Sequence, residues 1–353
     1  MPGRLRVGVD AANLPRDHRG MGRYVRSVLH EFATRLSDRV QLTLLVPDPL
    51  PGLVARRYLE DLPGDATVAR RSAAGKRRLD VLWYPWNGMT WRAPAPSVVT
   101  VHDVWPFVAP SGDARVRARE QAHYLAAAEG AALIIAISEF TRREIIRLLG
   151  VSAERIQVIH QGVAPPLAVS APARIEDSAR YVLFVGEVEP RKDVGTLIEA
   201  MRRLPEDLRS DTALVIVGRA RGLSASDAEG VRIRLAGEIA DDAQLGALYA
   251  GAAAFAFPSR YEGFGLPLLE AMSYGAPVVA SDAASIPEVG GEAALYFPCG
   301  DAQALADALT RVLRDPALAR TMSAAGVARA ASFGEEVRAR KTLAALESVA
   351  RTP

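Results

Sequence analysis

The chain has 353 residues, of which 49% are hydrophobic and 24% are charged, and its formal net charge is +2. At about 150 residues per domain, this length predicts two domains, each large enough for its own core. The nearly balanced charge argues against a dedicated nucleic-acid binder, which normally has a concentrated basic face. The single cysteine, Cys299, excludes an internal disulfide and a zinc cluster, and we expect it to be inert.

The sequence has no charged-then-apolar leader, and no run of about 18 apolar residues that could form a spanning helix. We therefore expect a cytoplasmic protein.

The first half of the chain alternates short apolar runs, typical of strands, with helical patterns. Residues 4–10 predict a strand, and a polar glycine-containing loop connects it to an amphipathic helix over about 22–36. Ser138 is a suitable N-cap for a helix over 138–149. The other expected elements are strands over 40–46, 80–84, 97–102, 132–137 and 155–160, and a helix over 113–129.

Residues 162–180 are rich in Ala, Pro and Ser and are the best candidate for a linker. After it the alternation of strands and helices starts again, and the tail is helical from about residue 316. The expected strands are 181–185, 213–217, 232–236, 253–257 and 278–280, and the expected helices are 194–204, 241–251, 266–274 and 301–313.

Apolar strands that alternate with helices indicate parallel sheets covered on both faces, so the predicted fold class is α/β with two doubly wound, Rossmann-like domains. We place the first domain at 1–165, a linker at 166–180, the second domain at 181–335 and a C-terminal helix at 336–353. Ligands of such sheets bind beyond the carboxyl ends of the strands. Two such edges that face each other would form a cleft.

Residues 262–270 tell more about function than any other part of the chain. Gly263 and Gly265 allow backbone N–H groups to approach a ligand closely. Pro267 suits the first turn of a helix, whose unpaired N–H donors favour a phosphate. Glu262 and Glu270 flank this turn, and a carboxylate at that position can accept hydrogen bonds from a sugar diol. The pattern therefore predicts a ligand that carries both phosphates and hydroxyls.

The segment from Ser259 to Glu270 resembles the signature of retaining glycosyltransferases of family four, which have the GT-B fold. Their pattern is a Glu, seven residues and a second Glu, usually with Phe-Gly between them. The resemblance implies that Glu270 holds the ribose hydroxyls and that Glu262 holds hydroxyls of the transferred sugar. It also implies that residues 263–266 place backbone amides near sugar and phosphate, and that residues 336–353 pack back on the first domain. The four amides belong to Gly263, Phe264, Gly265 and Leu266.

Residues 184–192 resemble the second donor motif of that family, in which a glycine, here Gly186, ends a strand and a lysine follows Pro-Arg. Lys192 supplies a compact positive charge and Arg191 a bidentate donor, both suited to a departing diphosphate. Many relatives have Arg directly after the glycine, whereas this chain has Glu187. That departure leaves part of the diphosphate clamp unassigned.

Three further segments resemble family motifs. The pair His102-Asp103 implies a histidine beside the donor sugar, with Asp103 orienting the loop or the imidazole. The segment 19–24, with Gly20, Gly22 and Arg23, implies a loop near the transferred sugar and the acceptor. Backbone groups near Ile239 are implied to contact the nucleobase.

A basic and aromatic stretch admits two interpretations. It could hold an anionic, lipid-linked acceptor at a membrane, which implies peripheral membrane association. Alternatively, the charges form a solvated loop and the tryptophans belong partly to the core. The residues are Arg70, Arg71, Lys76, Arg77 and Arg78, with Trp83, Trp86, Trp91 and Trp105 downstream.

The resemblance as a whole implies a metal-independent, retaining hexosyltransferase that uses a nucleotide-diphosphate sugar, needs no cofactor and modifies a saccharide, lipid-linked or secondary-metabolite acceptor. The acceptor is expected to attack on the face that the nucleotide leaves, with the leaving phosphate oxygen helping to take its proton. The form of residues 189–192 resembles bacterial enzymes that transfer mannose or similar hexoses, which favours GDP-mannose.

Three alternatives stay open at this point. The first is a nucleotide-sugar epimerase of the same fold, which needs no acceptor. The second is a non-catalytic protein that binds the sugar nucleotide. The third is a dinucleotide oxidoreductase, which needs a full glycine fingerprint. In the motif that begins with Gly20 and Gly22, the position of the third glycine is occupied by Val25.

Overall fold

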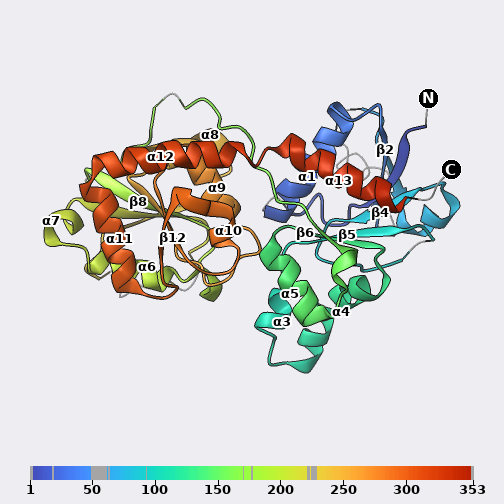
Figure 1. Cartoon of the computed structure of the whole chain (residues 1–353), viewed down its shortest axis with the longest axis horizontal. Helices are drawn as coiled ribbons and strands as arrows, with labels where there is room; N and C mark the ends of the chain where they lie inside the picture. Colours follow the sequence, from blue (N-terminus) through green and yellow to red (C-terminus); the bar gives the residue numbers. More distant parts are fainter. Residues whose placement is uncertain are drawn as a thin grey trace. The chain divides into compact units, whose positions relative to one another are not determined.

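A computed structural model describes residues 3–17, 20–48, 62, 64–92, 94–169, 171–175, 178–220, 223 and 229–350. The chain forms two compact units (Figure 1). The first contains Met1–Gly162 together with Glu335–Pro353, and the second contains Val163–Gly334. The chain therefore passes from one unit to the other twice.

The first unit is built on a seven-stranded parallel sheet with the order β3-β2-β1-β4-β5-β6-β7. The reversal of strand order lies between β1 and β4, which makes the sheet doubly wound. The strands are β1 (Leu5–Asp10), β2 (Val40–Val46), β3 (Thr67–Arg70), β4 (Val81–Tyr84), β5 (Ser97–Val101), β6 (Leu133–Ala136) and β7 (Ile156–Val158).

The helices of this unit follow the amphipathic patterns of the sequence. Ser138 caps α5 as expected, because its hydroxyl accepts a hydrogen bond from Thr141 N at 2.9 Å, and Gly150 ends the helix at φ 65°. The helices are α1 (Gly20–Thr34), α3 (Trp105–Val108), α4 (Ala114–Gly130), α5 (Glu139–Leu149) and α13 (Glu335–Val349), with 3-10 turns η1 (Arg71–Lys76) and η2 (Ala153–Arg155).

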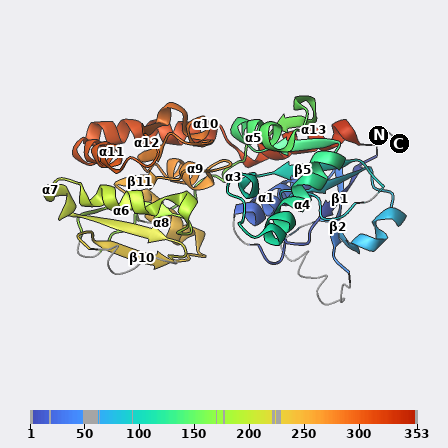
Figure 2. The same cartoon turned by 90° about the horizontal axis from the view of Figure 1, so that it is seen from below.

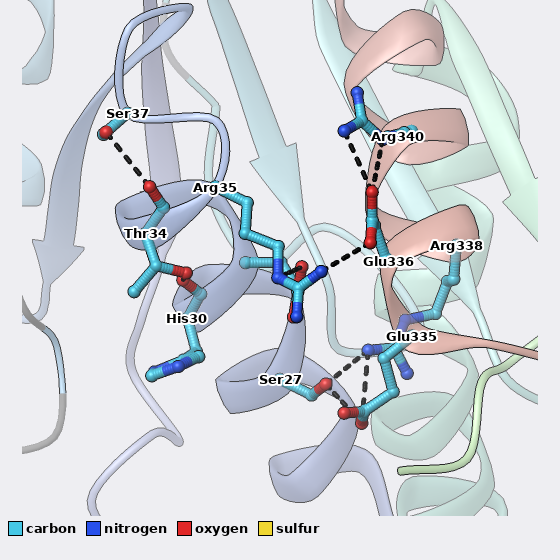
Figure 3. Close-up of polar contacts among 10 residues, drawn as sticks. Ser27, His30, Thr34, Arg35, Ser37, Glu335, Glu336, Arg338 and Arg340 are labelled. Atoms are coloured by element: carbon cyan, nitrogen blue, oxygen red, sulfur yellow. Dashed lines mark hydrogen bonds and ion pairs between the residues drawn. The ribbon is translucent and has the colours of Figure 1, made fainter. Parts of the chain in front are cut away.

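Helix α13 comes from the end of the chain, yet its apolar face belongs to the core of the first unit. Leu343 and Leu346 are fully buried among the side chains of α1 and the sheet. Polar contacts flank this apolar seam (Figure 3): Arg35 Nη1 lies 2.5 Å from Glu336 Oε2, and Ser27 bonds to Glu335.

The second unit contains a six-stranded parallel sheet with the order β10-β9-β8-β11-β12-β13 and its reversal between β8 and β11. The strands are β8 (Arg180–Val185), β9 (Thr212–Val217), β10 (Ile233–Gly237), β11 (Ala254–Phe257), β12 (Val278–Ser281) and β13 (Ala294–Phe297).

Helices cover both faces of this second sheet. Val182 and Phe184 of β8 pack with α6 and α11 on one face, whereas Leu183 between them points to the other face and is equally buried. The last two helices of the unit, α11 and α12, lie side by side (Figure 1, Figure 2). The helices are α6 (Val194–Arg202), α7 (Glu206–Arg209), α8 (Asp242–Gly251), α9 (Leu266–Ser273), α10 (Ile286–Gly290), α11 (Ala302–Arg314) and α12 (Pro316–Ala331), with 3-10 turns η3 (Pro190–Lys192) and η4 (Gly291–Ala293).

The segment that the sequence suggests as a linker runs along the second unit where it is described. Val163 N donates to Phe333 O at 2.8 Å, next to a parallel bridge between Val163 and Gly334. Ala173 N donates to Ala247 O at 2.9 Å, at α8. Both boundaries between the units, 162/163 and 334/335, therefore lie beside this one backbone pairing.

The predicted two-sheet α/β fold is confirmed, and the predicted strands and long helices agree with the structure to within about two residues at most ends. The sequence predicted the edge strands β7 and β10 but not the other two, β3 and β13. Each has four residues, of which only one is fully buried, so neither carries the continuous apolar run of a central strand. No helix in the described ranges has both the length and the apolarity needed to cross a bilayer.

Candidate active site

In the second unit, the loops after β8, β9 and β10 meet at the carboxyl edge of the sheet. Gly186 N donates to Val217 O at 2.9 Å, and Gly218 N donates to Gly237 O at 2.7 Å. Gly218 has φ +123°, and a Cβ atom there would lie 2.3 Å from Gly186 O. Only glycine allows the backbones to approach this closely.

The turn η3 follows β8 and carries the two cations of the second donor motif. Asp193 ends the turn in the left-handed region, at φ 49°, and accepts from Thr196 Oγ1 at 2.8 Å and from Arg260 Nε at 2.9 Å. Arg260 N donates to Arg191 O at 2.7 Å. These contacts join η3 to the segment after β11, its neighbour across the reversal of strand order.

Across this junction, Glu262 meets both cations. Lys192 Nζ lies 2.5 Å from Glu262 Oε1, and Arg191 Nη1 lies 3.4 Å from Glu262 Oε2. Arg191 also pairs with Glu189 at 2.7 Å. Glu262 and Lys192 are buried, with 6% and 8% of their surfaces exposed, and Lys192 Nζ lies 5.5 Å from the ring centroid of Phe257.

Two opposing effects set the pKa of Glu262. Burial is the largest single effect and raises the pKa, but the attraction of Lys192 and Arg191 and the hydrogen bonds to the carboxylate together outweigh it, so the pKa lies below the usual glutamate value. The carboxylate is therefore ionised at neutral pH, and the buried cluster contains two cations around one acidic group.

Buried serines hold the loop that carries Glu262. Ser285 Oγ lies 2.9 Å from the carbonyl oxygens of both Glu262 and Phe264, and Ser281 Oγ donates to Ser259 O at 2.5 Å. Sequence reasoning did not single out Ser281 or Ser285. In the sequence, Ser281 could have been noticed as a polar residue that ends an apolar strand, and Ser285 as a second polar residue four positions later.

Helix α9 begins directly after this loop. Gly265 is its N-cap at φ +110°, where a side chain is strained, and the helix has Pro in its first turn as predicted. Glu270 lies one turn into α9, where its Oε2 accepts from the hydroxyl of buried Tyr249 at 3.0 Å. Sequence reasoning also missed Tyr249, which comes from α8.

The remaining predicted donor contacts lie in the same unit. Leu266 is the first residue of α9, and Gly263 is buried in the loop before it. Ile239 is half-buried two residues beyond β10, and Glu187, which replaces the Arg of many relatives, is half-buried next to Gly186.

In the first unit, His102 follows β5 and is 5% exposed. Its Nε2 lies 2.9 Å from Pro85 O and its Nδ1 lies 3.1 Å from Gln161 Nε2. Burial lowers the pKa of His102 to about 4, so the ring is neutral at pH 7. Asp103 accepts from Trp105 N at 3.0 Å and so orders the turn into α3.

The residues predicted for the acceptor side differ in how closely other atoms surround them. A Cβ atom on Gly22, in the first turn of α1, would lie 1.7 Å from Asp17 O, so the close approach of Asp17 to the helix requires glycine. Gly20 has no atom within 4 Å of such a position, and both Gly20 and Arg23 are exposed. Arg19, which opens the motif, lies outside the described residues.

The basic and aromatic stretch divides into two groups. Trp83 and Trp86 are buried, and they donate to Thr100 Oγ1 at 2.9 Å and to Asp10 O at 2.6 Å. Arg71 pairs with buried Asp10 at 2.6 Å. The exposed residues are Arg70, Lys76, Arg77 and Arg78. Within the described ranges, no three His, Cys, Asp or Glu side chains are grouped so that they could hold a metal ion.

Comparison with known proteins gives two family matches that divide the chain. Residues 19–165 match Glycosyltransferase Family 4, and residues 169–329 match Glycosyl transferases group 1.

Several curated bacterial proteins are similar in sequence. O-antigen chain mannosyltransferase B of Escherichia coli is 35% identical over 257 residues, which cover 68% of this chain and 67% of the relative. Serotype-specific mannosyltransferase WbdA of the same species is 31% identical over 271 residues, 70% of this chain but only 32% of that longer protein. Phosphatidyl-myo-inositol mannosyltransferase of Mycobacterium leprae is 36% identical over 225 residues, 61% of this chain and 59% of the relative.

Solved structures share the fold. Sucrose-phosphate synthase of Thermosynechococcus elongatus superposes with a TM-score of 0.75 at 20% identity, over 98% of this chain and 99% of that chain. Anabaena HepE in complex with UDP-glucose gives 0.73 at 19% identity, over 98% and 100%. At these identities the likeness concerns the fold alone.

Proposed function

The chain belongs to the family-4 glycosyltransferases with the GT-B fold, and on this basis we propose that it is a retaining hexosyltransferase that uses a nucleotide-diphosphate sugar, GDP-mannose in the first instance. The acceptor that we propose is a saccharide, free or lipid-linked, or a secondary metabolite. The observation that carries this proposal is the buried cluster of Glu262, Lys192 and Arg191.

This cluster suits a ligand with a diphosphate at one end and hydroxyls at the other. Lys192 and Arg191 are donors only, and a diphosphate offers them oxygens that carry more charge than one carboxylate. When the cations turn to the diphosphate, Glu262 can accept hydrogen bonds from hydroxyls of the transferred sugar. In the absence of donor, Glu262 and Glu189 together balance the positive charges of Lys192 and Arg191.

The nucleoside end of the donor is assigned to the other residues of this sheet edge. Glu270 would hold the ribose hydroxyls, with Tyr249 fixing one of its carboxylate oxygens. Backbone groups near Ile239 would contact the base. The start of α9, with the amides of Gly263, Phe264, Gly265 and Leu266, would lie near sugar and phosphate.

The proposed reaction is a substitution that retains configuration. The acceptor oxygen forms a bond to the anomeric carbon on the face from which the nucleotide departs, while the bond from that carbon to the phosphate oxygen breaks. The acceptor proton passes to the departing phosphate oxygen. Lys192 and Arg191 stabilise the charge that develops on the diphosphate, so we propose that neither a metal ion nor a covalent side-chain nucleophile is needed.

Mannose is proposed as the transferred sugar because three of the similar bacterial proteins are named as mannosyltransferases. A saccharide acceptor is supported by the name of the O-antigen chain enzyme. We also propose a cytoplasmic protein that reaches lipid-linked acceptors at the inner membrane face through exposed Lys76, Arg77 and Arg78.

The test is a thermal-shift and transfer assay with a panel of sugar nucleotides. A preferred donor stabilises the folded protein by mass action, so GDP-mannose should raise the Tm more than UDP-glucose does. Mass spectrometry with saccharide acceptors should then show one added hexose and free GDP. Isomerised sugar in a reaction without acceptor would instead establish the epimerase, and stabilisation without any turnover would establish a binding protein.

A second measurement isolates the nucleotide site. Calorimetry with free GDP should show weaker binding for Glu270→Gln, because the amide has one acceptor oxygen where the carboxylate has two. Glu292→Gln, at an exposed position of η4 in the same unit, is the matched control and should bind like the parent. Equal affinity of Glu270→Gln and the parent would contradict the role of Glu270.

A further inference from the structure

Both ring nitrogens of His102 have a hydrogen-bond partner inside the first unit. Nε2 lies 2.9 Å from Pro85 O, and Nδ1 lies 3.1 Å from the side-chain nitrogen of Gln161. His102 and Gln161 are each 5% exposed. Gln161 lies three residues beyond the end of β7, far in sequence from His102, which follows β5.

These two contacts determine the proton arrangement of the ring. A carbonyl oxygen accepts only, so Nε2 must carry a proton and donate it to Pro85 O. The ring is neutral, so Nδ1 is then an acceptor and receives an N–H of Gln161. The opposite amide orientation would place Gln161 Oε1 against the Nδ1 lone pair, and it suits only a doubly protonated ring.

The surroundings of the ring oppose a second proton. Tyr24 packs edge-to-face on the imidazole at 4.9 Å, and buried Arg338 lies 5.2 Å from the centroid of Tyr24. Arg338 lowers the pKa of His102 and Asp17 raises it, but both effects are smaller than that of burial. Gln161 Oε1 has no hydrogen-bond partner among the described residues. Leaving this buried acceptor unpaired costs free energy, and the amide nevertheless directs its N–H to Nδ1.

The backbone of His102 is also held in place. Its N–H donates at 2.5 Å to the side chain of Asn87, a residue in the left-handed region at φ 65°. Arg338 in turn donates to Gly162 O at 3.4 Å, next to Gln161. The ring, its amide partner and the loop after β4 therefore form one connected arrangement.

We propose that Gln161 is a positioning residue: by donating to Nδ1 it prevents protonation of that nitrogen and keeps His102 a neutral ring that donates from Nε2. As a consequence, His102 takes no part in proton transfer. This inference rests on the proposed function for its bearing on catalysis. It implies that His102 cannot act as the base that takes the acceptor proton.

The experiment is ¹⁵N NMR of the histidine rings in the full chain between pH 5 and 8. The signals of His102 are identified by their loss in His102→Asn. In the parent we expect a protonated Nε2, an unprotonated Nδ1 and no titration in this window. A His102 that carries its proton on Nδ1, or that titrates near the ordinary pKa of 6.5, would overturn the inference.

Variants of Gln161 separate its effect from that of Pro85. In Gln161→Glu the carboxylate can accept from Nδ1–H, so His102 should become doubly protonated within the window. In Gln161→Leu, which introduces no charge, Pro85 O still holds the proton on Nε2, and the Nδ1 signal should shift because it loses its hydrogen-bond donor. Gln157→Glu makes the same charge change at an exposed position of β7 and should leave the His102 signals unchanged.

Ring signals of Gln161→Leu identical to those of the parent would show that Gln161 donates no hydrogen bond to Nδ1, which contradicts the inference. Transfer assays add an independent readout. If His102 is only a hydrogen-bond donor, kcat of the parent should show no step from His102 between pH 5 and 8, whereas Gln161→Glu should acquire one. A chain that transfers no sugar contradicts the proposed function and leaves the NMR result on Gln161 intact.

Discussion

At the scale of single residues, the decisive feature is a buried cluster with two cations and one carboxylate. Removing one partner of a buried ion pair leaves an uncompensated charge, which is strongly destabilising even where the pair itself contributes little. Function and stability are therefore coupled at Glu262, and a loss of activity there must be separated from a loss of folding.

We expect Glu262→Ala to abolish transfer and to lower the free energy of unfolding by about 3–5 kcal/mol, while the protein still folds. Transfer rates, circular dichroism and urea denaturation measure the three effects. The double variant Glu262→Ala/Lys192→Ala should recover part of the stability and none of the activity. Asp207→Ala removes an exposed ion pair with Arg314 and should change stability by less than about 1 kcal/mol. Parental transfer by Glu262→Ala would refute its role.

A second residue-scale prediction concerns pH. The pKa of His102 is about 4 in the folded chain and near 6.5 when unfolded, so the unfolded state binds more protons between these values. The stability due to the neutral ring is present above pH 6.5 and is lost as the pH falls toward 4. From pH 7 to pH 5 the parent should lose about 2 kcal/mol more than His102→Gln, measured by urea denaturation. If the free energy of unfolding fell equally with pH in the two proteins, the low pKa assigned to His102 in the folded chain would be contradicted.

At the scale of elements, the site is formed by loops that follow neighbouring parallel strands. The loops after β8 and β11 carry Lys192 and Glu262, and these strands are neighbours because the strand order reverses between them. Close backbone contacts also join the loops after β8, β9 and β10, and Gly218 allows this approach because it has no Cβ atom.

Gly218→Ala tests this packing of loops. Its Cβ would lie 2.3 Å from Gly186 O at a φ that disfavours a side chain, so we expect a loss of about 2–5 kcal/mol of stability from overpacking and strain. Gly195→Ala in α6 meets no atom within 4 Å and should stabilise by about 0.5–1 kcal/mol. Thermal and urea unfolding compare the two. If Gly218→Ala were as stable as the parent, the loops could not be packed as described.

At the scale of the whole molecule, the chain crosses from the first unit to the second at 162/163 and returns at 334/335. The returning segment ends in α13, which completes the core of the first unit. Two stretches separated by nearly half of the sequence therefore have to fold together.

Leu343→Ala should destabilise the first unit by about 2–5 kcal/mol, because Leu343 is fully buried between α1 and the sheet and its truncation leaves a cavity. Val337→Ala on the exposed face of the same helix, with 52% of Val337 exposed, should change stability by less than about 0.5 kcal/mol. Hydrogen exchange resolved by residue can assign the loss to the first unit. An equal effect of both substitutions would contradict the packing of α13.

Much of this protein follows from its sequence alone. Buried parallel strands need continuous apolar runs and the helices need amphipathic ones, so the alternation of the two patterns predicted both sheets. The glycines, the proline and the two glutamates of residues 262–270 indicated a sugar-nucleotide ligand through local chemistry, and the same residues indicated the family to which the chain belongs.

Contacts between residues far apart in the chain were decided only by the tertiary structure. Whether Lys192 and Glu262 form a buried pair depends on which strands are neighbours, and no local pattern encodes that order. The hydrogen bonds of Ser285, Tyr249 and Gln161 also belong to this class, because a single polar residue looks the same in sequence whether it is solvated or holds a functional group. Periodicity reports which face of an element is buried, whereas the partner of a polar atom is fixed only when the layers pack together.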